Sequence, residues 1–144
     1  MADLIKFKII TPERVVFSDE VSQITVMTKT GEITILPHHI PLVSLMQPGE
    51  LRYVKNGEEK LIAVSTGFIE VKPKSEVVIL ADTAEHATEI DLARAEEARA
   101  KAASLMSSAR FKDDVEYVTL QASMEKALSR LRVGNKYRKI SSSK

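Results

Sequence analysis

The chain changes composition near residue 85, and this change limits the folds that are open to it. All five prolines and four of the five glycines come before that point, where they divide the chain into short segments. The remainder is rich in alanine, glutamate, lysine and arginine, which are strong helix formers. We therefore expect an α+β protein, with short strands in residues 1–84 and helices after them.

The first part carries the two-residue period of half-buried strands. Apolar residues alternate with lysines over residues 5–9, and residues 32–35 repeat the alternation with other polar partners. Asn56-Gly57 separates two further runs, and this pair readily adopts the positive φ angles of a type I′ turn. A second hairpin is expected across residues 73–75. Short strands at this spacing predict an antiparallel β-sandwich or barrel.

The second part has the 3.6-residue period of helices. Thr88 is a candidate N-cap, with Glu89 and Asp91 in the first turn, where a carboxylate favours the helix dipole. The first helix would present a stripe of mainly small residues and the second a stripe of larger ones. These stripes are Ala95, Ala98, Ala102, Leu105 and Ala109, and then Tyr117, Leu120, Met124, Leu128 and Leu131.

A break over residues 107–112 would join the helices, with the two aspartates of 113–114 as caps of a second helix that ends before Gly134. Residues 85–133 would then form an antiparallel helical hairpin, and the basic tail 134–144 would be disordered. Each buried alanine methyl contributes only about 0.8 kcal/mol. The hairpin is therefore either displaceable by a better partner or permanently docked, and the sequence favours neither.

The composition argues against most kinds of chemistry. The chain has no cysteine, which excludes disulfides, thiolate nucleophiles and cysteine-based metal sites, and it contains no P-loop and no Gly-x-Ser-x-Gly elbow. Neighbouring strand residues point to opposite faces, so His38 and His39 are not expected to share a metal ion. No apolar run reaches the ~20 residues that span a bilayer. We expect no catalytic centre and no metal site.

The end of the chain is basic although the whole chain has a formal net charge of only +1. No acidic residue follows Glu125. The basic residues are Lys126, Arg130, Arg132, Lys136, Arg138, Lys139 and Lys144. Such a run is commonly a solvated surface; as an interaction element it would prefer an acidic protein surface. Nucleic acid is not expected as a partner, because no aromatic stacking platform accompanies the charge.

A polar cluster surrounds the start of the first predicted helix. Asp91 and Arg94 are three residues apart and project from one face, after Glu85 and before Arg99. The simpler interpretation is a helix cap with an ion pair between the two side chains. The alternative is a polar pocket in which Arg94 binds phosphate and a carboxylate accepts hydrogen bonds from an amine or from hydroxyls.

Three segments of the sequence resemble one protein family. The stretch from Thr30 to Leu42, which contains Gly-Glu-Ile-Thr-Ile-Leu-Pro-His-His-Ile-Pro-Leu, is similar to the signature of the ATP synthase epsilon (plant mitochondrial delta) family. Residues 65–71, Ser-Thr-Gly-Phe-Ile-Glu-Val, resemble its second block, and residues 7–12, Phe-Lys-Ile-Ile-Thr-Pro, resemble its usual beginning. With the helical hairpin, the resemblance covers residues 1 to about 133.

The resemblance implies a non-catalytic rotor subunit of the central stalk. Its sandwich would contact the gamma subunit and the c-ring, coupling proton transport to ATP synthesis at the cytoplasmic face of a bacterial plasma membrane. The hairpin would extend among the alpha, beta and gamma subunits and inhibit ATP hydrolysis. The implied interface residues are Gly31, Leu36, Pro37, His38, Pro41 and Leu42, and the implied inhibitory contacts are Arg130, Arg132 and Lys136.

The resemblance also implies a regulatory nucleotide. Residues 90–95 are similar to the Ile-Asp-x-x-Arg-Ala motif with which some family members bind ATP, no cofactor being obligatory. The candidate nucleotide-binding residues are Glu85, Ile90, Asp91, Arg94, Ala95, Lys126 and Arg130. Strong ATP binders carry an arginine where this chain has Lys126, and lysine lacks the bidentate fork. The alternative function is a free-standing β-sandwich adaptor with a helical tail that binds a partner.

Overall fold

The computed structural model describes residues 3–108 and 115–142. Ten strands come first, followed by a short 3₁₀ helix, η1, and two α-helices. The strands are β1 (Ile5–Ile10), β2 (Val15–Val21), β3 (Gln23–Thr28), β4 (Gly31–Ile35), β5 (Leu42–Met46), β6 (Gly49–Lys55), β7 (Glu58–Val64), β8 (Gly67–Lys72), β9 (Glu76–Ala81) and β10 (Ala84–His86). The helical elements are η1 (Ala87–Glu89), α1 (Leu92–Ser107) and α2 (Val115–Ser142).

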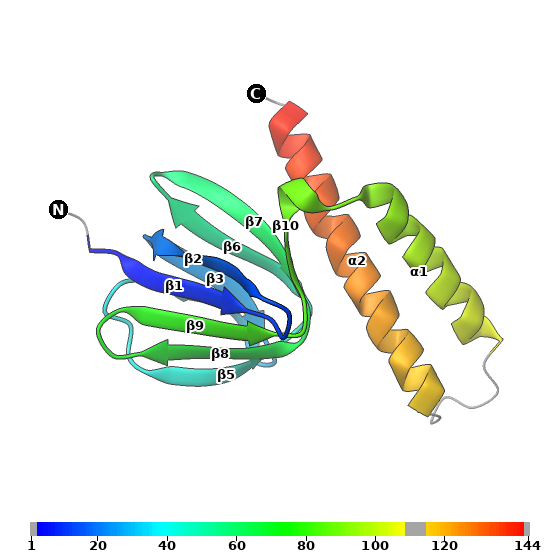
Figure 1. Ribbon diagram of the computed structural model, residues 1–144, viewed down its shortest axis with the longest axis horizontal. Helices are drawn as coiled ribbons and strands as arrows, with labels where there is room; N and C mark the ends of the chain where they lie inside the picture. Colours follow the sequence, from blue (N-terminus) through cyan, green and yellow to red (C-terminus); the bar gives the residue numbers. More distant parts are fainter. Residues whose placement is uncertain (1–2, 109–114, 143–144) are drawn as a thin grey trace.

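The strands form the predicted sandwich (Figure 1). One layer has the order β10-β7-β6-β3, with β4 paired to β3, and the other has the order β5-β8-β9-β1-β2. The layers are joined where Thr28 of β3 pairs with Met46 of β5. Among the described strand pairs, β1 and β9 run parallel and the others antiparallel, so the prediction of an antiparallel sandwich holds except at this pair.

The alternation seen in the sequence places the core between the layers. Ile5, Phe7 and Ile9 are buried while the intervening lysines are exposed. Phe7, Phe17 and Tyr53 pack against one another, with ring centroids 4.7 to 6.1 Å apart. Such tilted pairs favour the packing of aromatic rings. The core draws its buried residues from the strands alone, between residues 5 and 81.

Both predicted hairpins are present. Asn56 and Gly57 have φ angles of 53° and 79°, the positive values of a type I′ turn, and they join β6 to β7. Lys74 and Ser75 also have positive φ angles, 65° and 55°, in the turn between β8 and β9. The argument that His38 and His39 point to opposite faces of a strand was wrong. His38 lies in the connection between β4 and β5 rather than in a strand.

Helix α1 begins later than the sequence suggested. Thr88 lies within η1, and Asp91 is the N-cap of α1. The Asp91 Oδ1 atom accepts a hydrogen bond from the backbone N–H of Arg94 at 3.2 Å. Asp91 therefore satisfies one of the backbone donors at the start of the helix, and the prediction of Thr88 as the cap was wrong.

Helix α2 continues past Gly134, where the sequence predicted its end. Gly134 is buried within the helix, and residues 134–142 are helical, which corrects the expectation of a disordered tail over that stretch. A Cβ atom at Gly134 would lie 2.5 Å from Cδ2 of Leu92 and 3.1 Å from Cγ2 of Ile90. The glycine thus permits the two helices to approach closely. The predicted link and caps, residues 109–114, lie outside the described residues.

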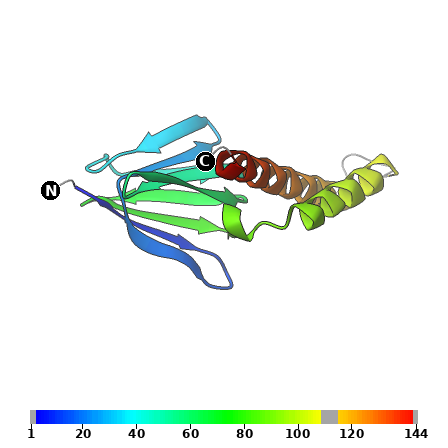
Figure 2. The ribbon, with the colours of Figure 1, turned by 90° about the horizontal axis from the view of Figure 1, so that it is seen from above.

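The two helices form a hairpin, with α2 lying between α1 and the sandwich (Figures 1 and 2). The predicted stripes were partly wrong. Ala95 and Ala102 are buried, but Ala98 and Leu105 are exposed, and Ala127 rather than Leu128 is buried on α2. Neither described helix combines the length and the apolar character that crossing a membrane requires.

Candidate functional site: the interface between hairpin and sandwich

The outer face of β7 carries the apolar part of this interface. Leu61 and Ala63 are buried there together with Ala87 and with Val133 of α2, and Ile90 packs against them. Ile62 and Val64 point into the sandwich core instead. Residues 61–64 are therefore all buried, because the core covers one face of the strand and α2 covers the other.

A bidentate ion pair joins α2 to β10. The Arg130 side chain donates hydrogen bonds from Nε to Glu85 Oε2 at 2.7 Å and from Nη2 to Glu85 Oε1 at 3.2 Å. The two side chains are 20% and 27% exposed. Partial burial and the fork geometry make this pair stronger than an exposed ion pair.

A second charged contact lies further along α2. Lys136 Nζ is 2.7 Å from Glu50 Oε1, and Arg52 donates to the same oxygen at 3.0 Å. The Glu50 side chain is only 12% exposed, and Arg52 also contacts Glu32. Burial tends to lower the pKa of Arg52, but the hydrogen bond to Glu50 and the two carboxylates outweigh it and raise the pKa. Glu50 is thus a shared anchor for the sandwich and the hairpin.

The structure brings some of the predicted nucleotide residues together. Glu85, Lys126 and Arg130 line one small pocket with Ser65 and Ser129. Its volume of about 10 Å³ leaves room for roughly one water molecule. In this conformation Glu85 and Arg130 bind each other, so a nucleotide would have to separate them.

The other predicted nucleotide residues do not line that pocket. Asp91 and Arg94 lie at the exposed start of α1, where the carboxylate caps the helix. Ala95 is buried in the hairpin and Ile90 packs at the apolar interface. Among the described residues Arg94 makes no salt bridge, so the cap is present but the expected ion pair with Asp91 is not.

The predicted interface loop lies at the end of the sandwich opposite the hairpin (Figure 1). His38, with a φ of 67°, contacts the Asp3 carboxylate at 2.7 Å, and its backbone N–H donates to Ser75 Oγ at 2.8 Å. Gly31, with a φ of 128°, is not part of this loop: it begins β4 at the other end of that strand, next to the β3–β4 turn that carries Lys29. Leu36 and Pro41 are exposed, while Pro37 and Leu42 are half-buried. These contacts tie the loop to the N-terminal segment and to the β8–β9 turn.

An apolar row lies exposed on the other layer, which α2 does not cover. Leu45, Phe68 and Leu80 are direct neighbours across β5, β8 and β9, and each is about half exposed. We call these three residues the outer apolar row. Val43, 68% exposed, lies beside it on β5. A group of exposed apolar side chains on one face is typical of a surface that binds another protein.

Sequence reasoning missed three residues at these places. The packing of α2 on the sandwich buries Ser129 and half-buries Glu50, and no local sequence pattern predicts such a contact. His39 is different, because the spacing Leu-Pro-x-His-x-Pro-Leu assigns the signature histidine to His39 and not to His38. His39 Nδ1 lies 2.6 Å from the carbonyl oxygen of Ile40. The described residues contain no group of acidic or histidine side chains suited to a metal ion.

Comparison with known proteins places these features in one family. Residues 4–87 match the family described as "ATP synthase, Delta/Epsilon chain, beta-sandwich domain", and residues 88–135 match "ATP synthase, Delta/Epsilon chain, long alpha-helix domain". The ATP synthase epsilon chain of Chloroflexus aggregans is 48% identical over 129 residues, which cover 90% of this chain and 91% of that one. The ATP synthase epsilon chain of Dehalococcoides mccartyi is 44% identical over 135 residues, 94% of this chain and 95% of that one.

The fold also matches a solved structure. A chain in a cryo-EM structure of the Euglena gracilis mitochondrial ATP synthase aligns with a TM-score of 0.74 at 22% identity. The alignment covers 88% of this chain and 78% of that one. At 22% identity this match shows a shared fold. The two family matches and the relatives above 40% identity show that the chain shares its ancestry with these proteins. The chain belongs to the ATP synthase delta/epsilon chain family.

Proposed function

We propose that this chain, as a non-catalytic central-stalk subunit, binds the gamma subunit through the outer apolar row and the c-ring through the β4–β5 loop. Leu45, Phe68 and Leu80 are exposed on the layer that the hairpin leaves free. The loop carries the exposed Leu36 and Ile40 at the far end of the sandwich. Two separate surfaces allow the sandwich to bind both rotor partners at once, so that the rotor turns as one body.

The hairpin is the regulatory element in this proposal. In the docked hairpin, Arg130 pairs with Glu85 and Lys136 pairs with Glu50. Extended, it would insert among the alpha, beta and gamma subunits and oppose ATP hydrolysis. Arg130 and Lys136 can contact acidic segments of those subunits only after leaving Glu85 and Glu50, so docking and inhibition compete for the same cations. The observation that carries the regulatory proposal is that sandwich carboxylates hold both Arg130 and Lys136 in the docked hairpin.

ATP is the proposed ligand that favours the docked hairpin. Lys126 and Arg130 lie at the pocket beside Glu85, and Arg94 lies at the start of the adjacent helix. Binding would replace the Arg130–Glu85 pair with contacts from Arg130 to phosphate and from Glu85 to nucleotide hydroxyls or the exocyclic amine. The ligand would then stabilise docking by RT ln(1 + [L]/Kd).

The proposed location is the cytoplasmic face of a bacterial plasma membrane. The chain would be held there peripherally through the gamma subunit and the c-ring. Membrane association would therefore be lost when the rotor is dissociated.

Substitution in the outer apolar row tests the rotor assignment. Phe68→Asp places a charge on an exposed position, so the fold should persist while binding to the gamma subunit weakens by about tenfold or more. Leu105→Asp is the matched control, because Leu105 is 44% exposed on α1, away from the row. Reconstitution into ATP synthase depleted of this subunit measures both. Equal retention of the two variants would contradict the proposed gamma surface.

A further inference from the structure

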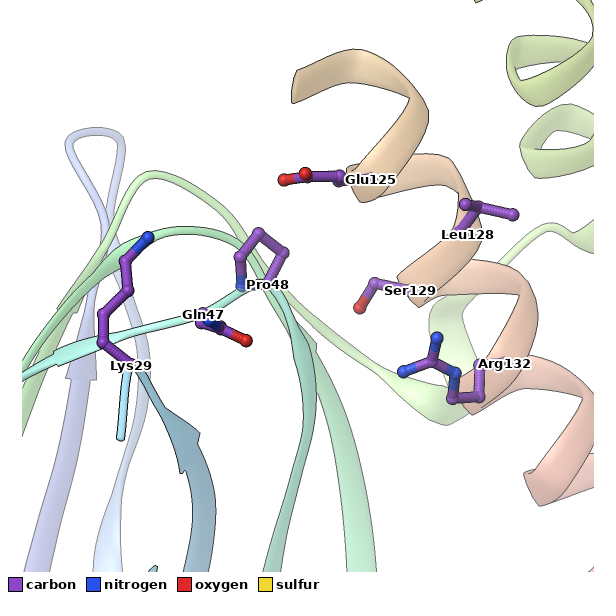
Figure 3. A pocket seen from close by; sticks show the side chains of 7 residues that line it. All are labelled: Lys29, Gln47, Pro48, Glu125, Leu128, Ser129 and Arg132. Carbon is purple, nitrogen blue, oxygen red and sulfur yellow. The ribbon is translucent and has the colours of Figure 1, made fainter. Parts of the chain in front are cut away.

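A second cavity lies between α2 and the sandwich, and Ser129 lines both this cavity and the proposed nucleotide pocket. The second cavity has a volume of about 220 Å³. Lys29, Gln47 and Pro48 line it from two turns of the sandwich, and Glu125, Ser129 and Arg132 line it from α2 (Figure 3). Its volume is below that of drug-sized sites, so it suits a small ion better than a nucleotide.

The hydroxyl of Ser129 lies in this cavity without a partner. Ser129 is 4% exposed, and its Oγ is the buried side-chain polar atom for which the described residues offer no hydrogen bond. Figure 3 shows this hydroxyl directed from α2 toward the turn at Gln47 and Pro48. Buried polar atoms normally have partners, so an unpaired hydroxyl directed into a cavity points to a ligand.

Two cationic side chains line the same cavity. Arg132 follows Ser129 by three residues and therefore lies on the same side of the helix. Lys29 lines the cavity from the turn after β3, on the far side of Pro48 from Ser129. Neither Lys29 nor Arg132 forms a salt bridge within the described part of the chain, whereas Arg130 and Lys136 both do. The turns themselves are fixed, since the Lys29 N–H donates to Leu45 O and the Gln47 N–H donates to Met27 O, each at 3.1 Å.

We propose that this cavity binds inorganic phosphate. The Arg132 guanidinium and the Lys29 ammonium supply charge-assisted donors, and the Ser129 hydroxyl supplies a third donor. Glu125 gives the site its selectivity, because an ionised carboxylate only accepts hydrogen bonds. Phosphate at neutral pH still carries a proton that it can donate to Glu125, whereas sulfate carries none.

The location of the site gives phosphate a structural effect. Lys29 belongs to the sandwich, whereas Ser129 and Arg132 belong to α2, so the complete set of donors exists only while the hairpin is docked. Phosphate would therefore stabilise the docked conformation by mass action. This effect concerns the isolated chain and does not depend on the proposed rotor role.

Calorimetric titration of the full-length chain with sodium phosphate and with sodium sulfate tests the proposal. We expect phosphate to bind and sulfate to bind at least about tenfold more weakly. Arg132→Gln should weaken phosphate binding about tenfold, and Ser129→Ala about two- to tenfold. Lys101→Gln, on the exposed side of α1, is the charge-matched control and should leave binding unchanged. Glu125→Gln should reduce the preference for phosphate over sulfate, because an amide can also donate.

Thermal unfolding separates a ligand role for Ser129 from a structural one. Without phosphate, Ser129→Ala should not lower Tm, since it removes an unpaired buried hydroxyl. Added phosphate should raise the Tm of the wild-type chain and raise the Tm of Ser129→Ala by less. No phosphate binding, or binding that falls equally in Lys101→Gln, would overturn the site. So would a loss of ATP binding in Arg132→Gln as large as its loss of phosphate binding, because the cavity would then belong to a nucleotide site.

Discussion

Arg130 on α2 and Glu85 on β10 are 45 residues apart in the chain and are joined by two hydrogen bonds. This pair and the contact between Lys136 and Glu50 are two charged connections between hairpin and sandwich. The apolar part of the same interface is small, with Val133 as the buried α2 residue of its cluster. Docking therefore depends substantially on charge.

A double-mutant cycle measures the Arg130–Glu85 pair. Arg130→Ala, Glu85→Ala and the double variant should give a coupling free energy of about 1–2 kcal/mol for hairpin opening, because the pair is bidentate and mostly buried. Hydrogen exchange of α2 amides in phosphate-free buffer measures this opening. Arg132→Ala, on the same helix but without a described ion pair, is the control. A coupling near zero would show that the pair does not hold the hairpin.

Glu50 should matter more than Lys136 for stability. Glu50→Ala removes the shared acceptor of Lys136 and Arg52, whereas Lys136→Ala leaves Glu50 paired with Arg52. We expect Glu50→Ala to lower the free energy of unfolding by about 1–3 kcal/mol and Lys136→Ala by about half that amount. Denaturant unfolding of both variants checks the order. A larger effect for Lys136→Ala would mean that Glu50 is not the anchor.

Gly67 should not tolerate a side chain. A Cβ atom there would lie 2.0 Å from the carbonyl oxygen of Leu80, which is backbone and cannot turn away. Gly67→Ala should therefore destabilise the sandwich by at least about 2 kcal/mol. Gly49→Ala is the matched control, since its Cβ would meet only Met27 Cβ at 4.0 Å. Thermal unfolding compares the two, and similar Tm values would contradict the packing described for β8 and β9.

The sandwich should fold without the hairpin. The residues of its core lie between 5 and 81, and the family match for the sandwich ends at 87. A fragment of residues 1–87 keeps β10, which pairs with β7, and should unfold cooperatively with a β-type circular dichroism spectrum. The fragment lacks α2, which covers Leu61 and Ala63 in the full chain, so a lower Tm than that of the full chain is expected. An aggregated or molten fragment would show that α2 is part of the folding core.

The features predicted correctly from the sequence are those that depend on residues close together in the chain. Period-two alternation marked β1, and Asn56-Gly57 marked the β6–β7 hairpin, because both depend on neighbouring residues. The end of α2 was missed for a tertiary reason. Gly134 usually marks a helix end, but here it gives room for Leu92 and Ile90 of the adjacent segment.

The candidate site was less accessible to such reasoning. Composition and motif named Glu85 and Arg130 separately, but only the fold shows that they bind each other and so close the pocket. Glu50 and Ser129 gave no signal at all, since their environment arises from a helix packed on strands distant in sequence. Long-range contacts of this kind require the structure.

Locking the hairpin in the docked position tests the regulatory account most directly. The chain has no cysteine, so Thr83→Cys and Ser123→Cys, which face one cleft between sandwich and α2, can be bridged selectively with a short bismaleimide. The bridged chain, reconstituted into ATP synthase depleted of this subunit, should permit faster ATP hydrolysis than the unbridged chain. Ser123→Cys alone, treated identically, should retain inhibition. Equal hydrolysis rates with bridged and unbridged chains would contradict the claim that the hairpin must leave the sandwich to inhibit.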